Sequence, residues 1–229
     1  MVFTEVLESK TGVLGMTNDS ITLSDKTIGR LSLYRRVLER TPKNNKPIGH
    51  IFSHELAALA GFSAVLVRRD LMTIGFSGNP KKGYDAAELL DCIGKFLDAP
   101  GGTNVALIGV GNLGRALLAY FTYRRPMLSI VAAFDANPEF TNRVIQGCRC
   151  YSPDDMERVV QEKNIRMGII AVPSVGAQDA ADRLMRLGVT GFLNFAPVAL
   201  RVPSSVYVNQ IDMTMELEKV AFYARQTKE

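Results

Sequence analysis

The sequence predicts an α/β protein in which a winged helix-turn-helix domain precedes a doubly wound, Rossmann-type parallel sheet. Strand and helix patterns alternate along the second half of the chain, which is typical of a parallel sheet covered by helices. The first strand of that half runs into a glycine-rich turn, VALIGVGNLGRALLAY, between Val105 and Tyr120. Two short helix patterns in the first half are joined by a Gly-Phe-Ser turn, which is the spacing of a helix-turn-helix.

The composition indicates a globular protein with reduced thiols. Of the 229 residues, 47% are hydrophobic, and no apolar run approaches the ~20 residues that cross a bilayer. The N-terminus MVFTEVLESK is mixed and charged, unlike a signal peptide. The cysteines, Cys92, Cys148 and Cys150, include one Cys-x-Cys pair without a second pair or a nearby histidine. We therefore expect no metal site, no membrane partner and a cytoplasmic location.

Basic residues concentrate between Lys26 and Lys82. Eleven Lys and Arg residues against three acidic ones give this segment a net charge of +8, so the rest of the chain carries −4. Such an asymmetry indicates a polyanionic partner at one end of the molecule. The alternative is a small helical domain whose basic face is only solvated.

The first domain is predicted over residues 1–98 and opens with a polar lead segment, residues 1–25, to which we assign no function. A helix pattern spans Thr27–Arg40 and ends in a loop with two prolines. The stretch SHELAALAG predicts a short helix that stops at Gly61, a residue suited to the turn after a helix. Ser63 can then cap the next helix, AVLVRRDLMTIG.

This next helix is the candidate recognition helix. We expect Val65, Leu66 and Leu71 to pack inward. Arg68 and Arg69 are expected to face outward, where arginines on such a helix reach guanine edges or phosphates. The helix therefore predicts a DNA-binding surface within the basic segment.

The stretch FSGNPKKGY predicts a hairpin wing after the recognition helix, because two glycines and a proline favour a tight reversal. Lys81 and Lys82 at its tip suit phosphates or the minor groove of DNA. A helix through Leu97 follows, and DAPGGTN, residues 98–104, is typical of a linker.

The second domain is predicted over residues 99–229. Its central strands are almost wholly apolar, as expected when helices cover both faces of a sheet. The predicted strands are Val105–Gly109, Leu128–Asp135, Met167–Pro173, residues 191–196 and residues 205–210, and the predicted last helix spans residues 212–227.

The glycine-rich turn predicts a dinucleotide site. Gly109 permits the tight turn, Gly111 lets the backbone approach a pyrophosphate, and Gly114 lets the helix pack against the strand. The start of the helix then offers free N–H groups and a positive dipole end to the phosphates. At the neighbouring strand end, the stretch AVPS is expected to supply a further contact to the cofactor.

Asp135 lies 21 residues beyond Gly114 at the end of the second predicted strand. A carboxylate there can accept hydrogen bonds from the adenosine ribose and would repel a 2′-phosphate, so we expect NAD(H) to be preferred over NADP(H). The alternative for Asp135 is a turn or helix cap in DANPEF.

Acid–base groups for hydride transfer are scarce beside this turn. Such chemistry needs a proton donor or acceptor near the nicotinamide. Both histidines, His50 and His54, lie in the first domain, and neither Tyr120 nor Tyr151 belongs to a Tyr-x-x-x-Lys pair. We therefore expect a protein that is not an enzyme. Two alternatives stay open: an NAD-dependent oxidoreductase with a small basic appendage, and a nucleotide- or CoA-binding module that only scaffolds a partner.

The pattern as a whole resembles the Rex family of redox-sensing transcriptional repressors. The resemblance extends over residues 27–225 and is carried by RLSLYRRVL, VRRDL, GVGNLGRALLAY, FDANPE, LNFAPV and VNQIDMTMELEKVAFYA in combination. The chain departs from the family in the wing, where Pro80 and Lys81 stand in place of a frequent Arg-Gly pair, and at Ser32, where a proline is common.

The resemblance implies a homodimer that binds palindromic operator DNA when NADH is scarce and leaves the DNA when NADH binds. It implies NAD as the cofactor, both as NADH and as NAD⁺. It also implies that the C-terminal helix, residues 212–227, is swapped, since in the family it inserts between the two domains of the other subunit.

Carried over residue by residue, the resemblance implies three sets of functional residues. Tyr120 would sense the reduced ring and pair with Asp212 of the partner subunit, for which Arg36 would compete in the DNA-bound state. The residues expected to contact DNA are Ser63, Arg68, Arg69, Lys81 and Lys82. The residues expected to bind the cofactor are Gly109, Val110, Gly111, Asn112, Leu113, Gly114, Asp135, Ala171, Val172, Pro173, Asn194 and Phe195.

Overall fold

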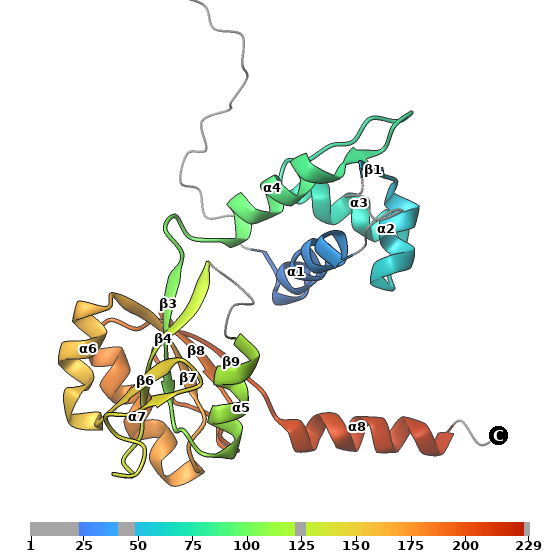
Figure 1. The fold of residues 1–229 in the computed structure, drawn as a ribbon. Helices are drawn as coiled ribbons and strands as arrows, with labels where there is room; N and C mark the ends of the chain where they lie inside the picture. Colours follow the sequence, from blue (N-terminus) through green and yellow to red (C-terminus); the bar gives the residue numbers. More distant parts are fainter. Residues whose placement is uncertain (1–22, 41–48, 122–126, 227–229) are drawn as a thin grey trace, which may run out of the picture. The chain divides into compact units, whose positions relative to one another are not determined.

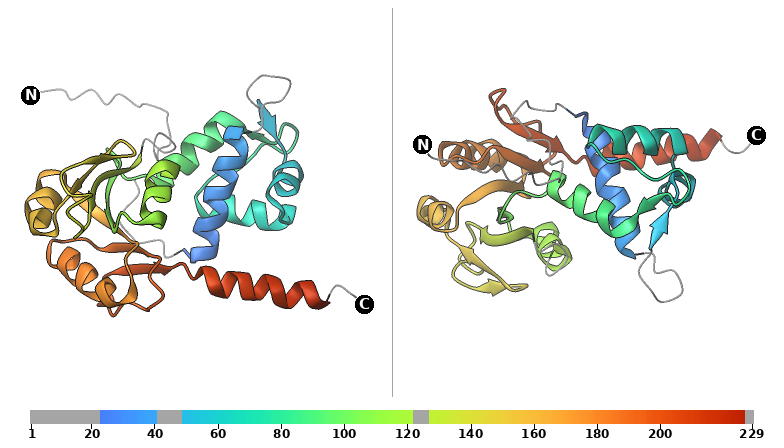
Figure 2. Two further views of the ribbon diagram at one scale, coloured as in Figure 1. Left: turned by 60° about the horizontal axis from the view of Figure 1, so that its bottom comes forward. Right: turned by 90° about the horizontal axis from the view of Figure 1, so that it is seen from above.

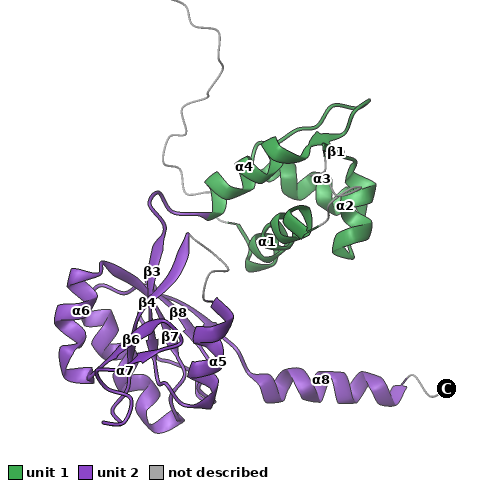
Figure 3. Ribbon diagram, viewed as in Figure 1, with its two compact units in different colours: residues 1–97 green, residues 98–229 purple. Residues whose placement is uncertain are grey.

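The computed structural model describes residues 23–40, 49–121 and 127–226. The chain divides between Leu97 and Asp98 into two compact units, shown in green and purple in Figure 3. Most of the predicted lead segment, residues 1–22, and the last residue of the predicted C-terminal helix lie outside the described residues. Each unit has a hydrophobic core of its own.

Unit 1 is a helix-turn-helix domain (Figure 1). Its described elements are α1 (Asp25–Arg40), β1 (His50–Ile51), α2 (Ser53–Ala60), α3 (Ala64–Thr73), β2 (Tyr84–Asp85) and α4 (Ala86–Leu97). As predicted, α2 stops at Gly61, whose φ of +75° is left-handed, and the Ser63 hydroxyl accepts the backbone N–H of Leu66 to cap α3. Two helices joined by this short turn confirm the helix-turn-helix.

The wing is smaller than the predicted hairpin. Its ladder is a single bridge between Asn79 and Gly83, and β2 pairs antiparallel with β1 instead of with the residues directly before the turn. A Cβ at Gly83 would stand 2.6 Å from the carbonyl oxygen of Ile51, so this crossing needs glycine. Lys81 and Lys82 occupy the turn and are exposed, and the Asn79 side chain accepts both of their backbone N–H groups.

A buried ion pair joins α1 to α3. Asp70 is only 2% exposed, and Arg30 donates to both of its oxygens, at 2.6 and 2.7 Å. The Tyr34 hydroxyl donates to Asp70 Oδ2 at 2.8 Å; burial first, and this hydrogen bond second, raises the pKa of Tyr34. Arg30 is one of the eleven basic residues counted between Lys26 and Lys82, and in the structure it pairs with Asp70 of α3.

The orientation of α3 corrects one expectation. Val67, Asp70 and Leu71 form its buried side, while Val65 is 67% exposed. The reason is the helical period, since residues three or four positions apart lie on one side of a helix. Arg30 holds Asp70 on the inner side, so positions 67 and 71 also face inward, and Val65 lies on the outer side with Arg68. Val65 was therefore wrongly predicted to pack inward, whereas Leu71 is buried as expected.

Unit 2 is built on a seven-stranded sheet within the described residues, in the order β5-β6-β4-β3-β7-β8-β9 (Figure 1). Only β5 is antiparallel to its neighbour, so the predicted doubly wound parallel sheet is confirmed. The strands are β3 (Thr103–Ile108), β4 (Leu128–Phe134), β5 (Val144–Ile145), β6 (Cys148–Tyr151), β7 (Ile165–Ile170), β8 (Gly191–Asn194) and β9 (Tyr207–Gln210).

Helices cover both faces of this sheet (Figure 2). Side chains of β3 alternate: Val105 and Leu107 pack with the helix α5 (Asn112–Phe121), and Ala106 and Ile108 face the other side. That other side is covered by α6 (Met156–Glu162), which follows the short turn η1 (Pro153–Asp155), and by α7 (Ser174–Arg186). Each face of the sheet therefore has its own cluster of buried, mostly apolar side chains.

The sheet differs from the sequence-based expectations in the bounds of its strands and in one additional hairpin. The strand β7 ends at Ile170 and not at Pro173, because Pro173 has no N–H group for a sheet ladder and stands directly before the first residue of α7. The hairpin β5–β6 had not been predicted, since two- and four-residue strands give too short a periodic signal.

The chain closes with α8 (Met213–Gln226), and every residue of this helix is exposed. Asp212 caps it, because its Oδ1 accepts the backbone N–H of Met215 at 3.0 Å. Large apolar side chains are among the exposed ones, namely Met213, Met215, Leu217, Val220, Phe222 and Tyr223. Within the described ranges, no helix has the length and apolar character required to span a bilayer.

We predict that Asp70→Ala lowers the free energy of unfolding of unit 1 by roughly 3–5 kcal/mol, because it leaves the partly buried Arg30 and the buried Tyr34 without their acceptor. The matched control is Asp91→Ala, which removes an exposed ion pair to Lys95 and should cost less than about 1 kcal/mol. Denaturant unfolding followed by circular dichroism measures both. If the two variants lose similar amounts of unfolding free energy, the ion pair between Arg30 and Asp70 does not stabilise the unit as proposed.

Candidate dinucleotide site and nucleic-acid interface

The glycine turn after β3 is sterically tight on one side and open on the other. Gly109 has a φ of +95°, and a Cβ there would stand 2.6 Å from the carbonyl oxygen of Ala171. A Cβ at Gly114 would overlap the carbonyl oxygen of Gly109. A Cβ at Gly111, by contrast, would meet nothing within 4 Å. The open side of the turn thus leaves room for a ligand to approach the backbone, as a pyrophosphate does in this kind of turn.

The first turn of α5 presents polar backbone groups beside this open space. Asn112 and Leu113 are exposed at the start of the helix, where the first N–H groups have no partner within the helix. The positive end of the helix dipole adds to the attraction for an anion. The Asn112 side chain accepts a hydrogen bond from Arg115 at 2.7 Å, which leaves the backbone N–H groups to the ligand.

Asp135 braces the glycine turn. Its Oδ2 accepts the backbone N–H of Val110 at 2.6 Å, and its Oδ1 accepts that of Asn137 at 2.8 Å. It therefore acts as the turn cap that the sequence analysis had left as an alternative. Each carboxylate oxygen retains a further lone pair, so Asp135 can still accept hydrogen bonds from the two hydroxyls of a ribose.

Residues 171–173 form the facing wall of the turn. The Ala171 N–H donates to the carbonyl of Ile108 at 2.8 Å, so the segment stays parallel to β3 for one residue after β7 ends. A Cβ at Gly109 would also stand 2.8 Å from the Val172 side chain. Pro173 is exposed and precedes the exposed first turn of α7. The structure thus brings Ala171 and Val172 directly against Gly109.

Asn194 is fully buried at the end of β8, and its side-chain amide forms hydrogen bonds within the protein. Its Nδ2 donates to the carbonyl of Val198 and to Gln210 Oε1, at 2.8 and 2.6 Å, and its Oδ1 accepts the N–H of Ala196. Gln210 closes the network by donating to the Ala196 carbonyl. In the structure, Asn194 therefore shapes the loop that carries Phe195, which is half-buried against the core beneath α5.

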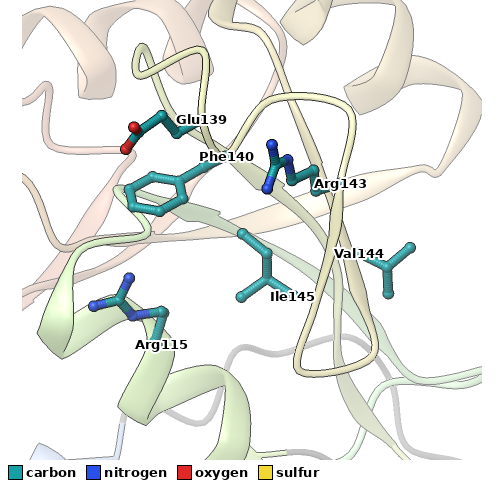
Figure 4. Close-up of a pocket in the computed structure, with 6 residues that line it drawn as sticks. All are labelled: Arg115, Glu139, Phe140, Arg143, Val144 and Ile145. Carbon is teal, nitrogen blue, oxygen red and sulfur yellow. The ribbon is translucent and has the colours of Figure 1, made fainter.

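A pocket of about 560 Å³ lies between α5 and the β4–β5 segment (Figure 4). The Arg115 guanidinium stands over the Phe140 ring, 5.5 Å from its centroid. The pocket is lined by Arg115, Glu139, Phe140, Arg143, Val144 and Ile145. This pocket was not predicted from the sequence, although two of its residues, the arginine directly after Gly114 and the phenylalanine of DANPEF, lie within motifs that the sequence singles out. The lining thus combines one aromatic ring, two arginines, one carboxylate and two aliphatic side chains.

The tyrosine and cysteine side chains of unit 2 differ in their exposure. Tyr120 lies on α5 and is 50% exposed, and Tyr151 is buried in β6. Burial raises the pKa of the Cys148 and Cys150 thiols to about 11, so both stay protonated at neutral pH. Among the described residues there is no cluster of three His, Cys, Asp or Glu side chains that could hold a metal ion.

The outer face of α3 carries the predicted DNA contacts. Arg68 and Arg69 are exposed, and Arg68 donates to the Ser53 hydroxyl at 2.9 Å, which ties the side chain to the start of α2. Ser63 is exposed, and its hydroxyl oxygen is engaged in capping α3. The Lys81 and Lys82 side chains are exposed on the wing turn.

The remaining two residues of the predicted switch lie on different units. Arg36 is exposed on α1, and Asp212 is half-buried before α8 with one oxygen engaged in capping that helix. The second oxygen of Asp212 retains its lone pairs for a cation or a hydroxyl.

Comparisons with known proteins agree with both units. Residues 22–71 match the family "Putative DNA-binding protein N-terminus", and residues 101–198 match the family "CoA binding domain". The chain is 40% identical over 204 residues to the redox-sensing transcriptional repressor Rex of Carboxydothermus hydrogenoformans, covering 89% of this chain and 97% of the relative. It is 36% identical over 211 residues to the Rex repressor of Lactobacillus gasseri, covering 92% and 98% of the two chains.

Solved structures of the same kind superpose on most of the chain. The crystal structure of RSP, a Rex-family repressor, matches with a TM-score of 0.77 and 31% identity, covering 90% of this chain and 96% of that one. RSP in complex with β-NAD⁺ and operator DNA matches with a TM-score of 0.80 and 30% identity, covering 90% and 94%. Together with the glycine turn and the helix-turn-helix, these similarities show that the chain belongs to the Rex family of redox-sensing transcriptional repressors.

Proposed function

We propose that this protein is a redox-sensing transcriptional repressor that binds palindromic operator DNA when the ratio of NADH to NAD⁺ is low and releases it when NADH binds. The observation that carries the proposal is the pairing, in one chain, of an open glycine turn with an exposed basic recognition helix. Relatives are named redox-sensing repressors, and RSP has been crystallised with β-NADH and with β-NAD⁺ plus operator DNA.

The dinucleotide would lie across the carboxyl edge of the sheet in unit 2. The exposed backbone at Gly111 and the first turn of α5 would hold its pyrophosphate, and Asp135 its ribose. Phe195 would line the nicotinamide side. When bound, the cofactor supplies the signal, because NADH and NAD⁺ differ by one hydride and one positive charge on the ring. The proposed cofactor residues are Gly109, Val110, Gly111, Asn112, Leu113, Gly114, Asp135, Ala171, Val172, Pro173, Asn194 and Phe195.

Operator DNA would be bound by α3 and the wing. Arg68 and Arg69 would contact bases or phosphates from α3, while Lys81 and Lys82 would contact phosphates or the minor groove. Ser63 would approach the DNA at the start of α3, where recognition helices meet base edges. A palindromic operator requires two such helices related by a two-fold axis, and hence a homodimer.

The exposed apolar side chains of α8 support a dimer in which this helix is exchanged between subunits. Isolated, such a surface would be unfavourable in water, and burying each large apolar side chain contributes roughly 1.5–3 kcal/mol. The exchange would bring Asp212 of the partner subunit towards Tyr120 in the NADH-bound state and towards Arg36 in the DNA-bound state. These two pairings would set the spacing of the recognition helices.

The pairing of Tyr120 with the partner's Asp212 cannot supply the whole switch. Moving an equilibrium from 1:99 to 99:1 takes about 5.5 kcal/mol of differential binding. One hydrogen bond to a charged group contributes about 1.5–3 kcal/mol. Exclusion of the positively charged NAD⁺ ring from the apolar surroundings of Phe195 would supply the remainder.

The protein would act as a cytoplasmic regulator and not as a catalyst. The chain has no histidine beyond His54, so unit 2 lacks the commonest proton donor for hydride transfer. Its buried thiols are protonated, and Asp135 is engaged with backbone N–H groups. These features favour a site that distinguishes the two forms of the cofactor without interconverting them.

We predict that Asp135→Ala weakens NADH binding roughly ten-fold or more. The substitution removes the carboxylate that would accept hydrogen bonds from the ribose hydroxyls and that accepts the backbone N–H of Val110. Asp135→Asn is the matched control, because its amide oxygen can still accept one backbone N–H while the negative charge is lost. In both variants, the affinities for NADH and for NADPH should differ less than in the wild type. Calorimetry measures these affinities. Equal binding of NADH and NADPH by the wild type would overturn the assignment of Asp135.

We predict that Arg69→Ala and Arg68→Ala each reduce operator affinity by roughly 1–3 kcal/mol if the side chain reads a base edge, with weaker sequence preference. If the arginine contacts a phosphate instead, its loss should weaken binding to all DNA sequences alike. The slope of the logarithm of the binding constant against the logarithm of the salt concentration should then fall in magnitude by about one unit. Arg158→Ala, at an exposed arginine of α6, is the control and should leave binding unchanged. Unchanged operator binding in the double variant at positions 68 and 69 would remove α3 from the interface.

We predict that Tyr120→Phe binds operator DNA normally but needs about ten-fold more NADH to be released, because it loses the hydroxyl that pairs with Asp212 of the partner subunit. Tyr207→Phe, at a similarly exposed tyrosine on β9, is the control. Fluorescence anisotropy of labelled operator, titrated with NADH, measures the release. Release of Tyr120→Phe at the wild-type NADH concentration would contradict the proposed switch.

A further inference from the structure

The outward face of α3 is unusual because apolar and basic side chains share it. Val65, Arg68, Arg69 and Met72 follow one another at the spacing i, i+3, i+4 and i+7, which places them on one side of the helix. Val65 is 67% exposed and Met72 is 71% exposed. Together with Thr73 they line an open depression of about 490 Å³. Apolar residues at this spacing usually face a core, whereas here Val65 and Met72 face outward on either side of the two arginines along the helix.

The two arginines restrict the kind of surface that can cover Val65. A surface that meets both guanidinium groups must carry negative charge, and the whole segment from Lys26 to Lys82 has a net charge of +8. The same surface must offer an apolar group to Val65. In the major groove of DNA, the 5-methyl group of thymine is the apolar group that the base edges present.

We propose that Val65 is a specificity-determining residue that packs against the 5-methyl group of a thymine in each operator half-site. The inference rests on the proposed function and specifies one base, a thymine, that the protein recognises in each half-site. Val65 lies one residue after the start of α3, and recognition helices contact base edges with their N-terminal residues. Arg68 and Arg69 lie one turn further along the same face, where they can reach neighbouring bases or phosphates.

Val65 is also presented rigidly. Its β-branched side chain has few rotamers, and the Ser63 cap fixes the first turn of α3. From behind, Arg30 and Tyr34 hold Asp70 and so prevent the helix from rotating about its axis. Met72 has the same exposure but lies two turns further along on a flexible side chain, which makes it a suitable control.

The experiment removes single methyl groups from the DNA. A set of duplexes carries the operator of RSP with one thymine at a time replaced by deoxyuridine, which keeps base pairing and deletes only the 5-methyl group. For the wild-type full-length protein, we expect one thymine per half-site at which the replacement weakens binding about four-fold, the effect of losing about one buried methyl contact. The remaining replacements should have little effect.

The variant Val65→Ala then tests which side chain meets that methyl group. It should bind the unmodified operator less tightly and lose its sensitivity to deoxyuridine at that one thymine, so that the two changes are not additive. Met72→Ala should retain the wild-type sensitivity. Alanine favours the helix, so both exposed positions should tolerate it.

Two results would overturn the inference while leaving the proposed function intact. One is operator binding that depends on Arg69 but is indifferent to every deoxyuridine replacement. The other is a sensitive thymine whose effect is the same in Val65→Ala as in the wild type. Failure of the wild type to bind operator DNA at any NADH concentration would overturn the proposed function itself.

Discussion

The dinucleotide unit depends on two close backbone approaches, that of Gly109 to the Ala171 carbonyl and that of Gly114 to the Gly109 carbonyl. Without Cβ atoms at the two glycines, the chain reverses directly at the end of β3 and α5 begins close against the sheet. The first N–H groups of α5 therefore point to the carboxyl edge of the sheet. The same approaches leave Gly111 open to the outside, so one packing requirement produces both the fold of the turn and the space for a phosphate.

In the helix-turn-helix unit, a polar contact decides the orientation of the recognition helix. Burying Asp70 is favourable only because Arg30 and Tyr34 satisfy both of its oxygens. This geometry fixes which side of α3 faces outward, and it brings Val65 next to the arginines. The buried carboxylate lies on the opposite side of α3 from the proposed DNA contacts, and its hydrogen bonds fix the orientation of that helix.

Side-chain hydrogen bonds also connect the cofactor edge with the C-terminal helix. Asn194 and Gln210 join the loop that carries Phe195 to the end of β9, two residues before the Asp212 cap of α8. A change in the Phe195 loop therefore has a short covalent and hydrogen-bonded route to the start of α8. The helix α8 itself exposes large apolar side chains, Leu217 and Val220 among them.

The sequence by itself determined the helix-turn-helix, the parallel sheet and the glycine turn, because capping residues, apolar runs and glycine spacing are local signals. It also singled out Asp135, Arg68 and Arg69 as candidate residues. Only the tertiary structure decided that Val65 faces outward, that Arg30 belongs to Asp70 and that Asn194 is buried in a network with Gln210. These outcomes depend on pairs of residues 16 to 40 positions apart, whose contacts no local period encodes.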